Sequence, residues 1–147
     1  MKQNQTERID RRGFLKSTSA AVIGTTFANV GLPSNTFASE NPPLKVGLIG
    51  CGGRGTGAAA QALQADPNVS LTAMGDVFAD RLEESYKALL EEVPQKVKVD
   101  KPKKFVGFDA YQKVIDSGVD VVLLATPPAF RPHHLMTAIN AGKPVFC

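Results

Sequence analysis

Five glycines between Gly50 and Gly57 mark the stretch of this sequence whose residue types and spacing best suit a chemical task. Three of them, Gly50, Gly52 and Gly55, have the spacing G-x-G-x-x-G. At a turn from a strand to a helix, the first glycine of this pattern permits the tight turn and the second lets a pyrophosphate approach the backbone. The third lets the helix pack on the strand. Free N–H groups and the helix dipole then favour the negative charge of a phosphate.

A carboxylate follows the glycines at the distance that this chemistry requires. Asp76 lies about 20 residues further on, where a dinucleotide-binding pattern places an acid for the hydroxyls of the adenosine ribose. The alternative is a glycine-rich turn in an unrelated α/β domain, with Asp76 only capping a helix. The sequence has a strand, a helix, a second strand and the acid in the expected order and spacing, and this favours dinucleotide binding.

The elements that must position these residues follow from apolar periodicity. It predicts strands over residues 44–49, 69–74, 105–107, 121–125 and 144–147, and helices over about 54–65, from about 80, from about 110 and over about 131–141. Capping-box spacing at the second and third helices relates Asp80 to Glu83 and Asp109 to Gln112. Strands that alternate with helices predict an α/β fold with a doubly wound parallel sheet.

The charge of the chain is concentrated in residues 1–38. This segment holds five basic and two acidic residues, a net charge of +3. The whole chain also has a net charge of +3, so residues 39–147 are formally neutral. The basic pI therefore gives no reason to expect nucleic acid as a partner. No run approaches the ~20 apolar residues that a bilayer crossing needs, so we expect no stable membrane span.

The N-terminal segment is typical of an export signal. The run from Arg11 to Lys16, RRGFLK, resembles the twin-arginine motif, although Asp10 stands where serine or threonine is usual, and a weakly apolar stretch follows it. We predict a twin-arginine signal peptide over residues 1–38, a linker over residues 39–43, and an exported, periplasmic protein. The alternative is a basic tail or an amphipathic arm. The twin-arginine route carries folded proteins, which suits a protein that loads a dinucleotide before export.

Three other groups of reactive side chains have plainer interpretations. The lysines of residues 93–104 are expected on a solvated loop that leads to the amino end of a strand, away from the ligand edge of the sheet. His133 and His134 point about 100° apart on a helix, His134 toward the sheet, so we expect no shared metal ion. Cys51 and Cys147 make neither a disulfide framework nor a zinc site. We expect two free thiols, because the fourth strand would hold the first and fifth ~10 Å apart.

From Lys45 onward the sequence resembles the N-terminal domain of the Gfo/Idh/MocA oxidoreductases, a family that includes glucose–fructose oxidoreductase and inositol 2-dehydrogenase. The resemblance is carried by the glycine loop, the strand end at Asp76, the run VDVVLLATP over residues 119–127, and AGKPVFC over residues 141–147. The chain departs from the family pattern at Pro128, where asparagine is usual, and at Arg131, where histidine is frequent. Both departures concern the substrate side of the site.

The resemblance implies a Rossmann fold that binds NAD, with NADP disfavoured because the carboxylate of Asp76 would repel a 2′-phosphate. Arg81 lies near enough in sequence to soften that repulsion. The resemblance further implies that the backbone of residues 51–54 holds the pyrophosphate and that residues 125–127 line the nicotinamide side. No metal ligand is implied. The cofactor-binding residues implied in this way are Gly50, Cys51, Gly52, Gly53, Arg54, Gly55, Asp76, Ala125, Thr126 and Pro127.

The family's Glu-Lys-Pro motif, whose lysine takes part in catalysis, would come directly after Cys147, followed by a second, substrate-binding domain. We therefore expect a sheet that is incomplete at its C-terminal end, no catalytic residue in this chain, and no dehydrogenase activity from it alone. Any homo-oligomer is expected to form through the second domain. The complete enzyme is expected to transfer hydride with a sugar or polyol. Two alternatives stay open: an NAD-dependent glycoside hydrolase of the same superfamily, and an inactive truncated fragment.

Overall fold

Apolar runs and helix-forming segments alternate along residues 42–147, which are the residues that the computed structural model describes. The predicted signal peptide lies outside them, so it stays a prediction. The strands are β1 (Leu44–Ile49), β2 (Val69–Asp76), β3 (Lys104–Val106), β4 (Val121–Leu124) and β5 (Val145–Phe146). The helices are α2 (Gly53–Ala65), α3 (Ala79–Glu92), α4 (Ala110–Asp116) and α5 (Arg131–Asn140), with a short 3-10 turn, η1 (Lys101–Lys103).

The five strands form one sheet in the order β3-β2-β1-β4-β5, and every neighbouring pair is parallel. This confirms the predicted doubly wound sheet and the predicted place of β4 between β1 and β5. The chain first runs from β1 to β2 and β3, and then returns to the other side of β1 for β4 and β5. The carboxyl end of β1 is therefore a topological switch point, where open α/β sheets bind their ligands.

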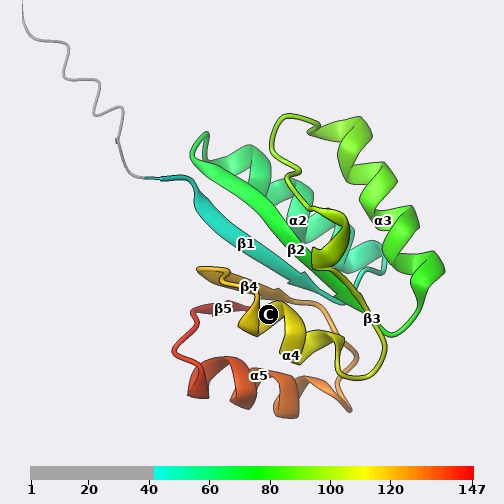
Figure 1. Ribbon diagram of the computed structural model, residues 1–147, viewed down its shortest axis with the longest axis vertical. Helices are drawn as coiled ribbons and strands as arrows, with labels where there is room; N and C mark the ends of the chain where they lie inside the picture. Colours follow the sequence, from blue (N-terminus) through cyan, green and yellow to red (C-terminus); the bar gives the residue numbers. More distant parts are fainter. Residues whose placement is uncertain (1–41) are drawn as a thin grey trace, which may run out of the picture. The chain divides into compact units, whose positions relative to one another are not determined.

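Two helix pairs cover the two faces of the sheet (Figure 1). On the side of α2 and α3, large buried side chains such as Leu48, Leu71 and Leu82 form one core cluster. On the side of α4 and α5, Ile49 and Val114 belong to a second cluster. The strand residues alternate between these clusters because successive side chains in a strand point to opposite faces.

Helix α4 packs close to the sheet over two glycines. A Cβ atom added at Gly47 of β1 would lie 2.7 Å from Cγ1 of Val114, and one added at Gly75 of β2 would lie 2.8 Å from its Cγ2. Glycine within a strand often marks such a close approach. The fully buried side chain of Val114 therefore locks α4 over the carboxyl half of β1 and β2, next to the switch point.

The lysine-rich connection between α3 and β3 is less solvated than predicted. Val97 and Val99 are buried in the core on the α2 and α3 side. Nζ of Lys96 donates hydrogen bonds to the backbone carbonyls of Leu63 and Asp66, at 2.5 and 2.7 Å. These carbonyls belong to the last turn of α2 and to its C-cap, where a cation complements the helix dipole.

The predicted capping boxes do not form. Helix α3 begins at Ala79, so Asp80 lies inside its first turn and makes no capping hydrogen bond. Asp109 does occupy the N-cap position of α4, but its carboxylate forms an ion pair with Lys113 at 2.7 Å instead of bonding the backbone. Strand β2 also continues two residues beyond its predicted end, so that Asp76 is its last residue.

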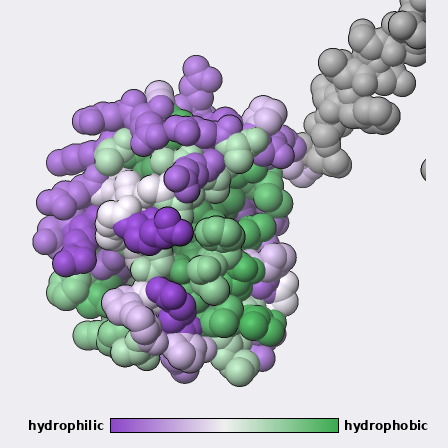
Figure 2. Space-filling view, turned by 180° about the vertical axis from the view of Figure 1, so that it is seen from behind, coloured by the Kyte–Doolittle hydropathy of each residue, from purple (hydrophilic) through white to green (hydrophobic). Residues whose placement is uncertain are grey.

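The side of the domain opposite the view of Figure 1 is unevenly polar. Figure 2 shows apolar residues gathered over one half of this face and polar residues over the other. Among the exposed large apolar side chains are Phe146 on the edge strand β5 and both Met136 and Ile139 on α5. Among the described residues, no helix combines the length and apolar character needed to cross a bilayer.

Candidate functional site

Two glycines of the loop between β1 and α2 are required by the fold itself. Gly50 has a φ of 95°, and a Cβ there would lie 2.8 Å from the backbone carbon of Ala125. A Cβ at Gly55 would lie 1.9 Å from the carbonyl oxygen of Gly50. The first and third glycines of the pattern thus allow the turn out of β1 and the close packing of α2, as their spacing predicts.

The middle glycine has no such requirement. Gly52 has a φ of −77°, which any L-residue adopts, and it occupies the N-cap position of α2 without a side-chain cap. The nearest atom to a Cβ added there is Nη1 of Arg81 at 3.8 Å, an ordinary contact distance. Because the protein alone leaves space for a side chain at Gly52, the glycine keeps open a surface at the amino end of α2.

Asp76 links this loop to the end of β2. Its Oδ2 accepts a hydrogen bond from the backbone N–H of Cys51 at 2.6 Å, and its Oδ1 accepts one from the backbone N–H of Phe78 at 2.9 Å. The carboxylate is therefore held by two backbone donors at the edge of the cleft. Each oxygen keeps acceptor capacity toward a ligand, because a carboxylate has about four lone-pair sites.

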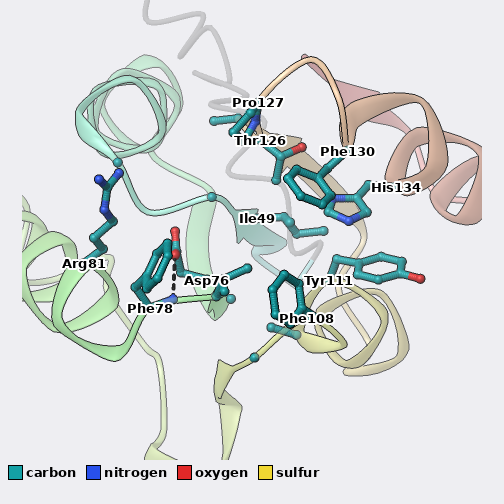
Figure 3. A pocket seen from close by; sticks show the side chains of 17 residues that line it. Ile49, Asp76, Phe78, Arg81, Phe108, Tyr111, Thr126, Pro127, Phe130 and His134 are labelled. Atoms are coloured by element: carbon teal, nitrogen blue, oxygen red, sulfur yellow. Dashed lines mark hydrogen bonds between the residues drawn. The ribbon is translucent and has the colours of Figure 1, made fainter.

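A cleft of about 410 Å³ opens beside Asp76, at the carboxyl ends of the strands (Figure 3). Asp76 and Arg81 stand at one end of it, whereas Tyr111 and His134 stand at the other (Figure 3). Its walls are mostly apolar and aromatic, a composition typical of sites for small organic ligands. The aromatic side chains that line it are Phe78, Phe108, Tyr111, Phe130 and His134.

The residues predicted for the site fall into three groups. Those that line the cleft are Gly50, Gly52, Asp76, Ala125, Thr126 and Pro127. Cys51 and Gly53 border a different hollow, between α2 and α3, which Gly52 also lines. Arg54 borders a third hollow together with Ala125 and Cys147, and Gly55 is buried beneath the loop.

Sequence reasoning missed the aromatic walls. Phe78 and Phe108 each lie two residues beyond the last residue of a strand, at Asp76 and Val106, and Phe130 immediately precedes α5. All three are exposed. The positions of Phe78 and Phe108 just after strand ends were a usable signal, since the carboxyl ends of parallel strands form one edge.

Two histidines and a tyrosine form a packed cluster at the end of the cleft away from Asp76. The ring of His134 stacks on that of Tyr111, with centroids 4.0 Å apart and planes inclined by 14°. The hydroxyl of Tyr111 shares a hydrogen bond of 2.9 Å with Nε2 of His133. Burial, and to a lesser degree the nearby His133, lowers the pKa of His134 below its usual value, so His134 is neutral near pH 7. His134, predicted on the side of the helix that faces the sheet, is half-buried, whereas His133 is exposed.

The thiol in the glycine loop is chemically quiet. Cys51 is buried, and its Sγ lies 3.6 Å from the carbonyl oxygen of Gly75. Burial and the negative charge of Asp76 raise its pKa to about 12, so the reactive thiolate is absent near neutral pH. Cys147 is exposed, and both cysteines are free. In the described part of the chain, no three histidine, cysteine or acidic residues gather as metal ligands would.

Comparison with known proteins assigns residues 44–147 to a family. A family model described as the oxidoreductase family with an NAD-binding Rossmann fold, Gfo/Idh/MocA, matches residues 44–147. No curated protein matches the chain at a significant level.

Solved structures give the same fold. Scyllo-inositol dehydrogenase from Lactobacillus casei, with bound NAD(H) and scyllo-inositol, is 24% identical with a TM-score of 0.55. A probable dehydrogenase from Thermotoga maritima is 29% identical with a TM-score of 0.54, and levoglucosan dehydrogenase in complex with NADH is 21% identical with a TM-score of 0.54. Each likeness covers 71% of this chain and 27% of the other, so the chain spans about a quarter of the length of these enzymes.

Proposed function

Because the chain belongs to the Gfo/Idh/MocA family of oxidoreductases and has that family's NAD-binding Rossmann fold, we propose that NAD(H) lies across the glycine loop and the aromatic cleft. The geometry of Gly52 carries this proposal. The fold does not need a glycine there, but a pyrophosphate that approaches the amino end of α2 does.

Most of the predicted residues are assigned to parts of the cofactor, whereas Gly50 and Gly55 serve the fold of the loop. The backbone of residues 51–54 binds the pyrophosphate, and Asp76 binds the adenosine ribose. Thr126 and Pro127 border the same cleft as Asp76, so we assign them to the adenosine half of the cofactor and not to the nicotinamide. Ala125 borders both the cleft and the hollow next to Cys147. We therefore assign it to the part of the cofactor that leads from the adenosine half to the nicotinamide.

Asp76 also favours NAD over NADP. A 2′-phosphate would come next to a carboxylate whose two oxygens are already fixed by backbone donors, and like charges at such distances repel. Arg81, at the same end of the cleft, is the cation that could reduce this repulsion, so we expect a preference and not an absolute exclusion.

When bound at this site, NAD(H) would supply hydride transfer, the chemistry of the oxidoreductase family. The substrate class that we propose is a sugar or polyol, since solved structures with this fold include enzymes of scyllo-inositol and levoglucosan. We further propose export by the twin-arginine route, on the strength of Arg11 and Arg12 before an apolar stretch.

Calorimetric titration of NAD and NADH into the protein that carries this chain tests the proposal. The wild type should bind, Gly52→Val should not, and Gly57→Ala within α2 should bind almost as well, because a Cβ at Gly57 meets nothing within 4 Å. Equal binding by all three proteins, or none by the wild type, would refute the site. Production of NADH from a panel of inositols and sugars then tests the substrate class. Export is tested with Arg11→Lys and Arg12→Lys in a secretion reporter.

A further inference from the structure

Two buried side-chain atoms at the cleft lack the hydrogen bonds that buried polar atoms normally have. They are Oγ1 of Thr126 and Nδ1 of His134, and in residues 42–147 no other buried side-chain nitrogen or oxygen is left without a partner. The side chains come from different elements, because Thr126 follows β4 and His134 lies on α5. Both residues line the same cleft.

Neither side chain is loosely placed. Thr126 is 8% exposed, and its backbone carbonyl accepts two hydrogen bonds from the guanidinium of Arg131, at 3.1 and 2.8 Å. His134 is fixed by its stack on Tyr111 and by its backbone N–H, which donates to the carbonyl of Phe130 at 3.2 Å. Both residues, whose unpaired atoms are buried, are therefore held at set positions beside the cleft.

An unsatisfied buried polar atom costs folding free energy that an apolar replacement would avoid. Native proteins contain few such atoms, and a functional partner is one of the standard reasons for them. Two of them at one cleft point to a single ligand group that offers a partner to each. A neutral imidazole nitrogen accepts or donates one hydrogen bond, and a hydroxyl does both.

The rest of the cleft defines the shape of that group. Phe78, Phe108, Tyr111 and Phe130 line it, and aromatic walls suit a flat ring. Asp76 stands at the other end, where the proposed function puts the ribose. The flat group joined to that ribose is adenine, whose amino group is a donor and whose neighbouring ring nitrogen is an acceptor.

We propose that His134 and Thr126 select the adenine base of the dinucleotide, with Nδ1 of His134 accepting from the 6-amino group and the hydroxyl of Thr126 donating to a ring nitrogen. This inference rests on the proposed NAD site and adds base specificity to it. The unpaired atoms are retained because the ligand completes their hydrogen bonds.

The probe is the NAD analogue in which hypoxanthine replaces adenine, so that an oxo group stands where the amino group was. The wild-type protein that carries this chain should bind NAD about 10-fold more tightly than this analogue, the effect of one lost hydrogen bond in a buried site. The test variants are His134→Phe, which keeps a ring to stack on Tyr111, and Thr126→Val, which keeps the shape of the side chain.

Each variant should weaken NAD and bring the NAD-to-analogue affinity ratio toward one, while its melting temperature stays the same or rises. A rise is expected because each change removes an unsatisfied polar atom. The matched controls are His133→Phe and Thr137→Val on the same helix, which should leave the affinity ratio unchanged.

The outcomes separate the two proposals. A wild type that binds both dinucleotides equally, or variants that keep the wild-type ratio, would overturn the base-selection proposal and leave the NAD site standing. Variants that unfold at lower temperature with an unchanged ratio would show that Thr126 and His134 serve the fold alone. A wild type that binds neither dinucleotide would refute the NAD site and this inference with it.

Discussion

Oδ2 of Asp76 accepts a hydrogen bond of 2.6 Å from the backbone N–H of Cys51, a residue 25 positions away in the sequence. The same carboxylate accepts a second hydrogen bond from the backbone N–H of Phe78. Asp76 thus joins the end of β2, the glycine loop and the turn before α3 in one network. The side chain proposed to bind the ribose also shapes the loop proposed to bind the pyrophosphate.

Replacing Asp76 by serine should separate NAD from NADP. The change removes a charged acceptor for the ribose, worth about 1.5–3 kcal/mol, and so should weaken NAD roughly 10- to 100-fold. NADP should lose less or gain, because the repulsion of its 2′-phosphate disappears. Calorimetric titration of both cofactors measures this, with Asp80→Ser as the matched control. Equal weakening of NAD and NADP would mean that Asp76 only braces the loop.

Alanine at two glycines of the loop should give opposite results. Gly55→Ala drives a methyl group against the carbonyl of Gly50, so it should lower the free energy of unfolding by roughly 1–3 kcal/mol or more. The methyl group of Gly52→Ala meets no such atom. This variant should change the free energy of unfolding by less than about 1 kcal/mol, the scale of an N-cap effect. Urea unfolding measures both. Comparable destabilisation by the two variants would contradict the distinct roles of these glycines.

Acid should weaken the fold through His134. Its pKa is lowered in the folded protein, so below the unfolded value of 6.5 the unfolded chain takes up the proton more readily. The contribution of His134 to the free energy of unfolding is constant above the unfolded pKa. It is lost as the pH falls from there toward the folded pKa. The loss of unfolding free energy between about pH 8 and about pH 5, the range in which histidine titrates, should be smaller in His134→Phe than in the wild type. An identical loss would show that His134 titrates normally.

The two cysteines should differ sharply in reactivity. Cys51 is buried with a raised pKa, whereas Cys147 is exposed. Iodoacetamide near neutral pH should label Cys147 in the folded protein, and Cys51 only after denaturation. Mass spectrometry of tryptic peptides without reduction follows both thiols. A disulfide between Cys51 and Cys147 would contradict the strand order, because β4 lies between the strands that precede them.

Residues that act through local backbone chemistry were predictable from the sequence. Gly50 and Gly55 were placed correctly because the turn and the close helix packing depend on a few neighbouring residues. The faces of His133 and His134 followed from helical periodicity, and the burial of β4 followed from its continuous apolar run. The strand order followed because right-handed crossovers leave few ways to wind such a chain.

Local patterns misled where a charged side chain found a partner outside the expected pattern. Asp109 has the spacing of a capping residue, yet its carboxylate pairs with Lys113. Lys96 looks solvent-exposed in the sequence, yet the folded chain brings it to the carbonyls that end α2. In both cases a charged side chain bonds to a group that the expected pattern did not include.

By itself, the sequence determined the glycine loop, the acid at the end of β2 and the parallel sheet, because each depends on periodicity or on short-range backbone geometry. Only the tertiary structure decided that Phe78, Phe108 and Phe130 share one cleft, since the parallel strands bring three separate loops to one edge. It alone also left Thr126 and His134 each with an unpaired buried atom. Whether a polar atom finds a partner depends on every element packed around it, and no sequence pattern records that.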